Sequence, residues 1–129
     1  MPNEGVPHRG EIYWIDVGDA IGDTPSKVRP CVVIQNDRDN ETRTVTLVVL
    51  ITTDSSSQSL PFAVHLKAGT SGINMDSYVN CGHIYTLSKC HLKEKVGKLA
   101  SVEMEEVERA ILYVLGLGSS RSISDSKPV

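Results

Sequence analysis

The chain has 129 residues, a formal net charge of −3 and 40% hydrophobic residues. This length suits one domain with a single core, and this charge excludes a surface that is basic throughout, so any contact with nucleic acid needs a local patch. No apolar run approaches the roughly 18 residues of a membrane span, which favours a soluble protein. The polar N-terminus and the odd number of cysteines, three, favour a cytoplasmic protein with reduced thiols.

The first two strands are separated by a segment rich in glycine and aspartate. Residues 11–17 (EIYWIDV) carry aromatic and β-branched side chains and predict a strand. Residues 18–27 (GDAIGDTPSK) predict an exposed, mobile loop. The second strand begins near Val28. Because Pro30 has no N–H to donate, we expect that part of the strand to lie at an edge or a bulge.

Turn chemistry then alternates with further strands. Residues 36–40 (NDRDN) predict a turn, and residues 54–59 (DSSSQS) predict a polar loop. A basic segment, LKEKVGKL, follows the last strand at residues 92–99. Further strands are expected at residues 44–52, 62–66, 77–81 and 83–87.

The last part of the chain has the pattern of an amphipathic helix. Ser101 is a candidate N-cap, although Met104 three residues later leaves the capping box incomplete. Gly116 and Gly118 should end the helix. The tail at residues 119–129 has little to bury and is expected to be disordered. Apolar residues recur at helical spacing at Met104, Val107, Ile111 and Leu115.

Together these elements predict one mainly β domain over residues 1–118, in the form of a small, strongly bent β-barrel or sheet capped by a C-terminal helix. Consecutive strands without helices between them argue against a parallel α/β sheet. The chain shows no internal repeat.

Most enzyme motifs are absent from the sequence. It contains no G-x-S-x-G, no P-loop and no dinucleotide-binding glycine pattern, so no cofactor is expected. Cys81, His83, Cys90 and His91 offer a Cys₂His₂ set, but their spacing is not that of a usual structural zinc site. Strand cysteines and solvated histidines are the simpler interpretation, and Cys31 within an apolar run should behave as a small hydrophobe.

Arg29 and the pair Thr52-Thr53 stand at the ends of apolar strands. An arginine at such a place most often makes a structural ion pair or binds a carbonyl, and threonines are ordinary β-formers. Beside the glycine-rich segment 18–27, however, the three side chains could form a phosphate pocket with a planar donor fork, a hydroxyl and backbone N–H groups.

Six segments, together covering about residues 8–118, resemble the MazF/PemK family of toxin ribonucleases. The R-G-x-I-Y opening and the V-R-P strand entrance are specific in combination, whereas the helix is generic. The segments are RGEIYWIDVG at 9–18, VRPCVVIQND at 28–37, LITTD at 50–54, LPFAVHL at 60–66, DSYVNCGHIYTLSK at 76–89 and MEEVERAILYVLGL at 104–117.

This resemblance implies an SH3-like barrel, a homodimer, and metal-independent, sequence-specific cleavage of single-stranded RNA. The 2′-hydroxyl would attack the adjacent phosphate and leave a 2′,3′-cyclic phosphate and a 5′-hydroxyl. The family's catalytic arginine falls on Arg29 and its catalytic threonine on Thr52. The resemblance also implies a MazE-like antitoxin, whose acidic, disordered segment would occupy the RNA site.

The sequence departs from the family in one late strand. Some members carry an acidic residue where this chain has Gly82, many have glutamine at His83, and some have arginine at Tyr85. His83 is therefore a possible catalytic assistant or a bystander, and Tyr85 could stack on a base. The residues expected to bind substrate are Gly22, Lys27, Thr53, Ser77, Asn80 and Tyr85.

Two other functions are compatible with such a fold. A CcdB-type toxin shares it and binds DNA gyrase through the end of its C-terminal helix, but this chain continues past Gly116 into a polar tail and retains Arg29 and Thr52. A barrel that served only as an interaction module would leave that pair of residues unexplained.

Overall fold

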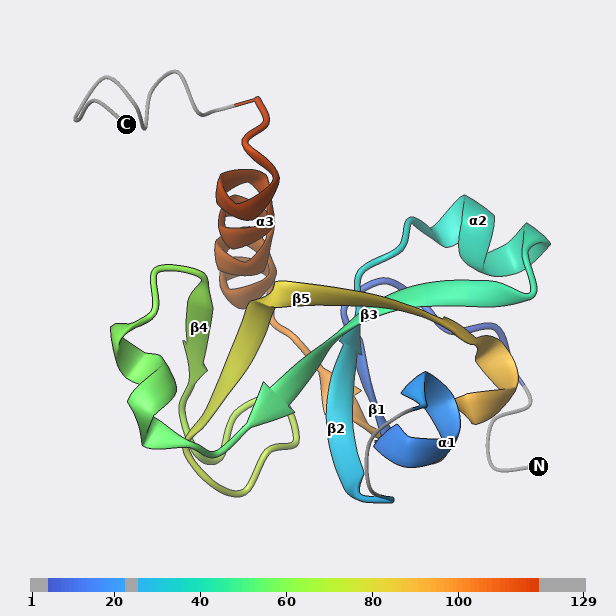
Figure 1. Cartoon of the computed structure of the whole chain (residues 1–129), viewed down its shortest axis with the longest axis horizontal. Coiled ribbons are helices and arrows are strands. Elements are labelled where there is room, and N and C mark those ends of the chain that lie inside the picture. Colours follow the sequence, from blue (N-terminus) through green and yellow to red (C-terminus); the bar gives the residue numbers. More distant parts are fainter. Residues whose placement is uncertain (1–4, 23–25, 119–129) are drawn as a thin grey trace.

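A computed structural model describes residues 5–22 and 26–118, and its main feature is one curled, antiparallel sheet in the order β4-β5-β3-β2-β1-β6 (Figure 1). The strands are β1 (Glu11–Asp16), β2 (Val28–Val33), β3 (Val45–Thr52), β4 (Ala63–Leu66), β5 (Ser77–Ser88) and β6 (Lys95–Lys98). The helices are α1 (Val17–Ile21), α2 (Asp37–Thr42) and α3 (Ser101–Leu115), with 3₁₀ turns η1 (Ser55–Ser59) and η2 (Lys89–His91).

This architecture confirms the mainly β prediction with a C-terminal helix. Every described strand pair is antiparallel. No helix of the described residues is long and apolar enough to cross a membrane. The tail predicted to be disordered, residues 119–129, lies outside the described part of the chain, and the single-domain boundary at residue 118 stays a prediction.

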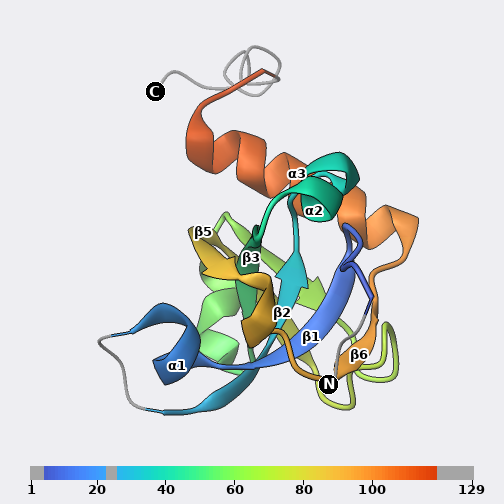
Figure 2. The same cartoon turned by 90° about the vertical axis from the view of Figure 1, so that its right-hand side faces the viewer.

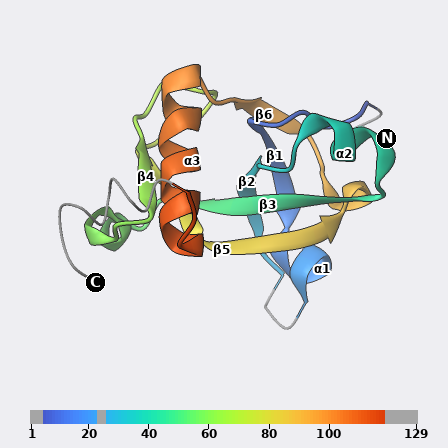
Figure 3. The same cartoon turned by 90° about the horizontal axis from the view of Figure 1, so that it is seen from above.

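The two faces of the sheet bury separate apolar clusters, because successive residues of a strand point to opposite faces. The helix-side cluster receives Val107 and Ala110 from α3, which packs on β4 and β5 (Figure 3). The α1-side cluster is covered by Ala20 and Ile21 of α1, at the opposite end of the molecule from α3 (Figure 2). The sheet contributes Ile12, Val32, Val49, Ile51, Val64, Leu66, Val79 and Cys81 to the first cluster and Tyr13, Ile15, Cys31, Val33, Val48 and Leu87 to the second.

β5 is one long strand, which corrects the expectation of two strands broken at Gly82. Its pairing with β3 slips between Val48, opposite Tyr85, and Leu50, opposite Asn80. Such a bulge bends a strand and increases its twist while keeping it continuous. β5 therefore follows the curl of the sheet across the whole molecule (Figure 1).

Two segments predicted as loop or turn contain short helices. The Asp16 carboxylate accepts the N–H groups of Gly18 and Asp19, which lets α1 begin at once after β1. The Asn36 side chain accepts the N–H of Asp39 and starts α2 in the same way. Glycine and aspartate content favoured a loop in both places, but local side-chain caps decide the outcome.

Three further expectations about local structure are corrected. The predicted polar loop at 54–59 winds into the 3₁₀ turn η1, and the basic segment 92–99 supplies the edge strand β6. The N-cap of α3 is Ala100 rather than Ser101, and the Glu103 carboxylate accepts the Ala100 N–H at 2.9 Å. Gly116 ends the helix as predicted, in the left-handed conformation with φ of 67°.

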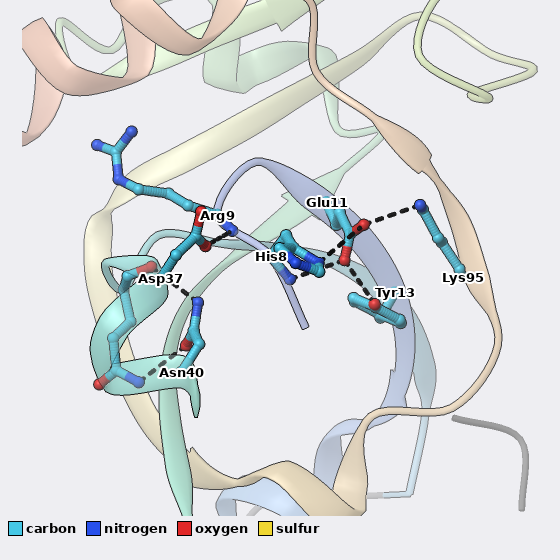
Figure 4. A network of polar contacts seen from close by, with 8 residues as sticks. His8, Arg9, Glu11, Tyr13, Asp37, Asn40 and Lys95 are labelled. Atoms are coloured by element: carbon cyan, nitrogen blue, oxygen red, sulfur yellow. Dashed lines mark hydrogen bonds and ion pairs between the residues drawn. The ribbon is translucent and has the colours of Figure 1, made fainter. Parts of the chain in front are cut away.

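A carboxylate network joins β1 to β6 (Figure 4). The buried Glu11 accepts hydrogen bonds from Lys95 Nζ at 2.8 Å, Tyr13 Oη at 2.6 Å and the His8 N–H at 2.8 Å. Burial opposes the charge of Glu11, but the hydrogen bonds from Lys95, Tyr13 and His8 together hold its pKa below the usual value. Burial and the nearby Glu11 carboxylate raise the pKa of Tyr13. Glu11 is therefore an ionised, fully bonded part of the packed sheet.

Candidate functional site

The β2–β3 pair opens at one end. The ladder runs from Val33 opposite Val48 to Cys31 opposite Leu50, and beyond it the ends of β2 and β3 separate (Figure 1). Pro30 lies in this separated part, so its missing N–H leaves no gap in the β2–β3 ladder. The expectation of an edge or a bulge at Pro30 is met only on the side of β3, because β2 is an internal strand and Pro30 pairs with Trp14 of β1.

A cleft of about 330 Å³ occupies this opening and brings together three residues expected at the site, Arg29, Thr53 and Ser77. Arg29 is half-buried and Thr53 is exposed, whereas the Ser77 side chain is buried and donates to the Met75 carbonyl at 2.8 Å. The full lining is Trp14, Val28, Arg29, Pro30, Ile51, Thr53, Gly72, Ile73, Asn74, Met75, Ser77 and Val96.

Thr52 stands on the other side of the same opening. Its half-buried Oγ1 accepts the Asp54 N–H at 3.1 Å, which ties the end of β3 to the turn η1. Strand alternation points Thr52 away from the cleft lined by Thr53. The last pair of the β2–β3 ladder is Cys31–Leu50. If the same register continued for two more residues, Arg29 would lie opposite Thr52. Because the strands separate, the two residues instead flank the opening.

His83 and Tyr85 form a second group, away from the cleft lining. Their rings stack with centroids 6.2 Å apart and an interplanar angle of 12°. His83 is exposed, while Tyr85 lies opposite Val48 and packs on the α1-side cluster. The pair presents an aromatic surface on β5 to solvent.

Phe62 fills the space beside Gly82, where some family members carry a carboxylate. A Cβ at Gly82 would lie 2.5 Å from Cε1 and 2.8 Å from Cδ1 of the Phe62 ring. Any side chain there would have to displace that ring, which packs against the helix-side cluster. The structure thus adds a packing reason for glycine at this position.

The remaining expected binding residues lie outside the cleft lining, in the connection between α1 and β2 or on β5. Gly22 ends α1 with φ of 84°, and the exposed Lys27 accepts the Val17 N–H at its carbonyl at 2.8 Å; residues 23–25 between them are outside the described ranges. Asn80 is half-buried, and its Oδ1 accepts the Gly82 N–H at 2.9 Å. Lys27 therefore directly precedes Val28 of the cleft lining, Gly22 lies outside that lining, and Asn80 helps to shape the β5 bulge.

Sequence reasoning missed two exposed apolar residues of the cleft. Trp14 is 38% exposed and Met75 is 62% exposed. Trp14 is the one large apolar residue of β1 that faces outward, and the residues on either side of it, Tyr13 and Ile15, are buried. The alternation of side chains along residues 11–17 predicts that Trp14 faces away from Tyr13 and Ile15. An exposed tryptophan on a core strand is unusual and therefore indicates a binding surface.

The cysteines and histidines do not assemble a metal site. Burial raises the pKa values of the Cys31 and Cys81 thiols to about 12, so both are neutral at physiological pH. Within residues 5–22 and 26–118, no group of three or more His, Cys, Asp or Glu side chains is placed to hold a metal ion. The zinc alternative built on Cys81, His83, Cys90 and His91 is therefore not supported.

Comparison with known proteins assigns the family. Residues 8–115 match the family described as PemK-like, MazF-like toxins of type II toxin-antitoxin systems. This chain belongs to that family. Its family match covers both flanks of the opening, including Arg29 and Thr52.

The relatives agree over nearly the whole chain. Endoribonuclease MazF6 of Mycobacterium tuberculosis (strain ATCC 25618 / H37Rv) is 40% identical over 113 residues, which is 87% of this chain and 99% of the relative. Endoribonuclease MazF of Staphylococcus saprophyticus is 34% identical over 114 residues, 88% of this chain and 95% of the relative. A solved mycobacterial endoribonuclease in complex with its cognate antitoxin has a TM-score of 0.70 at 25% identity, covering 88% of this chain and 97% of that one. These matches do not favour the gyrase-binding, CcdB-type alternative.

Proposed function

We propose that this toxin cleaves single-stranded RNA at specific sequences by attack of a 2′-hydroxyl on the adjacent phosphate. The family of the chain and relatives up to 40% identical identify it as an endoribonuclease toxin of a type II toxin–antitoxin system. One structural observation supports this proposal: β2 and β3 separate at their ends, so that Arg29 and Thr52 flank an opening whose cleft is lined by Arg29.

The proposed chemistry is an internal transfer within the RNA. The 2′-oxygen forms a bond to phosphorus as the bond to the 5′-oxygen breaks, and the proton lost from the 2′-hydroxyl is balanced by one gained by the leaving 5′-oxygen. The Arg29 guanidinium neutralises the charge that grows on the phosphorane oxygens, and the Thr52 hydroxyl donates a further hydrogen bond. Arg29 is not the base, because a guanidinium loses its proton only above about pH 12.

The base that receives the 2′-proton is not a carboxylate at position 82. Phe62 occupies that space, and the histidine of β5, His83, is exposed and carries a side chain of the type that most often serves as a general base. We propose His83 as a candidate that assists in accepting this proton. If His83 takes no part, we expect a water molecule to accept it.

The surroundings of the opening suit a single strand of RNA. Lys27 supplies an exposed cation next to Val28 of the lining, and Thr53 and Ser77 line the cleft; farther along β5, away from the cleft, Tyr85 offers a ring on which a base could stack. Gly22 and Asn80 complete the set of proposed binding residues. A cytoplasmic location would give such a site access to messenger RNA.

Two partners accompany this proposal. The first is a second copy of the chain, because one small curled sheet offers too little surface to hold a long RNA segment. Sedimentation at micromolar concentration should show a dimer, and a monomer alone would argue against it.

The second partner is a MazE-like antitoxin whose acidic segment binds near Arg29. Growth arrest by the toxin expressed alone, relieved by the product of the neighbouring gene, would support that partner.

The function itself can be tested with a mixed single-stranded RNA in EDTA. Wild-type protein should give discrete fragments without added metal, and added magnesium should not be required. Intact RNA after incubation with a folded, purified sample would contradict the proposal.

A further inference from the structure

A second cavity lies on β4 and β5, apart from the cleft at Arg29. Its volume is about 270 Å³, and it is lined by Gln58, Ala63, His65, Asp76 and Tyr78. His65 lies opposite Tyr78 in the β4–β5 ladder, and their rings stack with centroids 5.1 Å apart at 23°. The Tyr78 side chain is largely buried, whereas half of the His65 side chain is exposed, at 51%. The two rings form a layered platform whose outer ring is open to solvent.

The rim of this platform carries both kinds of hydrogen-bonding group. Tyr78 Oη donates to Gln58 Oε1 at 3.4 Å, which turns the Gln58 amide toward the cavity rim. Asp76 Oδ1 accepts the Ala68 N–H at 2.7 Å, while Oδ2 stands 3.9 Å from His65 Nε2. In the described residues no hydrogen bond engages Gln58 Nε2 or Asp76 Oδ2, so one donor and one carboxylate acceptor remain for a ligand.

The position of the cavity relates it to the proposed cut site. Thr52 lies opposite Tyr78 in the β3–β5 ladder, and Tyr78 lies opposite His65 in the β4–β5 ladder. Directly opposed residues on neighbouring strands share a face and stand about 5 Å apart, so the backbone of His65 is about 10 Å from that of Thr52. A nucleotide next to a phosphate held at Thr52 can reach that far.

We propose that this cavity binds a guanine base of the RNA at one fixed position beside the cut. The proposal rests on the proposed function and names a specificity determinant for it. A base would stack on the exposed face of His65, as bases do on aromatic side chains in single-strand recognition. Asp76 would accept hydrogen bonds from the base, and the Gln58 amide would donate one.

Guanine is the base whose edge matches these groups. Its Watson–Crick edge presents N1–H and N2–H₂ side by side, next to the O6 acceptor. Adenine and cytosine each place a ring-nitrogen acceptor beside their amino group, and uracil flanks its single N–H with two oxygens. The Asp76 carboxylate, whose Oδ2 accepts no hydrogen bond in the described residues, repels those acceptors, so Asp76 selects the edge that has two adjacent donors.

Two substitutions and a matched control test this pocket. His65→Ala removes the outer ring and should lower cleavage of the preferred RNA by about tenfold to a hundredfold, in line with the loss of one stacking contact. Asp76→Asn keeps an oxygen for the Ala68 N–H but replaces the second acceptor, and should reduce the preference for guanine more than the overall rate. His91→Ala, beyond the far end of β5, is the control and should match wild type.

The experiment has two arms with separate readouts. Sequencing of the fragments from an RNA pool with randomised positions around the cut should show guanine enriched at one position, and that enrichment should fall in Asp76→Asn. Wild-type protein without RNA should be titrated with each of the four nucleosides and followed by NMR. Guanosine should cause the largest shifts of the His65 ring and Gln58 amide signals. No base preference at any position, or equal shifts with all four nucleosides, would overturn the proposal. Guanosine binding without RNA cleavage would uphold the pocket and contradict the proposed function instead.

Discussion

The two ends of the β2–β3 pair differ in what they do for the molecule. In the packed segment, Val32, Val33, Val48 and Val49 face each other across the ladder, and none of their surface is exposed. At the open end the same strands separate, and a half-buried Arg29 borders a cleft. The difference teaches that one strand pair can be closely packed at one end and leave polar side chains accessible at the other, where we propose that the chemistry takes place. Substitutions should therefore lower stability in the first region and activity in the second.

The largest expected effect is on activity, at the open end. Arg29→Ala should lower the cleavage rate by at least about 10² to 10³, because it removes a preorganised charge from the transition state. The melting temperature should stay close to that of wild type, since Arg29 does not contribute to either apolar cluster. Arg38→Ala, which removes the same charge from the exposed surface of α2, is the control for net charge. Equal losses in both variants would mean that charge alone, rather than position, matters.

The matching substitution in the packed segment should affect stability instead. Val49→Ala removes two methyl groups from a fully buried site and should lower the free energy of unfolding by about 2 kcal/mol. Chemical denaturation measures this change, and cleavage per folded molecule should be retained. Val102→Ala, at a position that is 62% exposed on α3, should change stability by less than about 0.5 kcal/mol.

Thr52→Ala should cause a smaller loss of rate than Arg29→Ala, about tenfold, because a neutral hydroxyl contributes less than a full charge. Thr52→Ser keeps an oxygen that can accept the Asp54 N–H and donate to the phosphate, so it should recover most of the rate. If serine fails as badly as alanine, the methyl group rather than the hydroxyl is important, and the catalytic role is wrong.

The packed region should also respond to acid through Glu11. Its pKa in the folded protein lies below the ordinary value of 4.5, so its ionised form stabilises the fold above that pH and this contribution is lost as the pH falls below it. The melting temperature of wild type should therefore drop more between pH 7 and pH 3 than that of Glu11→Gln. Glu105→Gln, on the exposed surface of α3, should keep the wild-type pH dependence. A parallel fall in wild type and Glu11→Gln would contradict this account.

The smallest effect is expected at His83. Because the side chain is exposed and lies outside the cleft lining, His83→Ala should leave the cleavage rate near that of wild type, with an unchanged pH profile. A steep loss of rate, accompanied by a shifted pH profile, would instead identify His83 as the base that replaces the family's carboxylate.

Much of the fold could be predicted from local patterns. The apolar runs at β2 and β3, the alternation in β4 and the helical spacing in α3 each reflect burial, which the residue types reveal directly. The misses came where a single contact decides the outcome: Asp16 caps α1 in a glycine-rich segment, and a bulge keeps β5 continuous across Gly82. Sequence spacing contains no record of which ring will fill the space beside a glycine.

The candidate site could be predicted only in part. The family resemblance predicts Arg29 and Thr52 as catalytic candidates, and the proline next to Arg29 indicates an interruption of strand pairing, which the structure has on the side of β3. The separation of β2 and β3 and the stacking of His65 on Tyr78 depend on the three-dimensional register, which brings together residues far apart in sequence. These features could not be read from one sequence.

We propose that the open end of the β2–β3 pair promotes cleavage of RNA, in which a 2′-hydroxyl of the RNA itself attacks the adjacent phosphate. The most direct measurement is mass spectrometry of the fragment ends from two matched RNAs in EDTA, one of which carries hydrogen in place of the 2′-hydroxyl at the cut site. We predict a 2′,3′-cyclic phosphate and a 5′-hydroxyl from the first RNA and no cleavage of the second. Fragments with 5′-phosphates, or efficient cleavage of the deoxy-substituted RNA, would contradict the account.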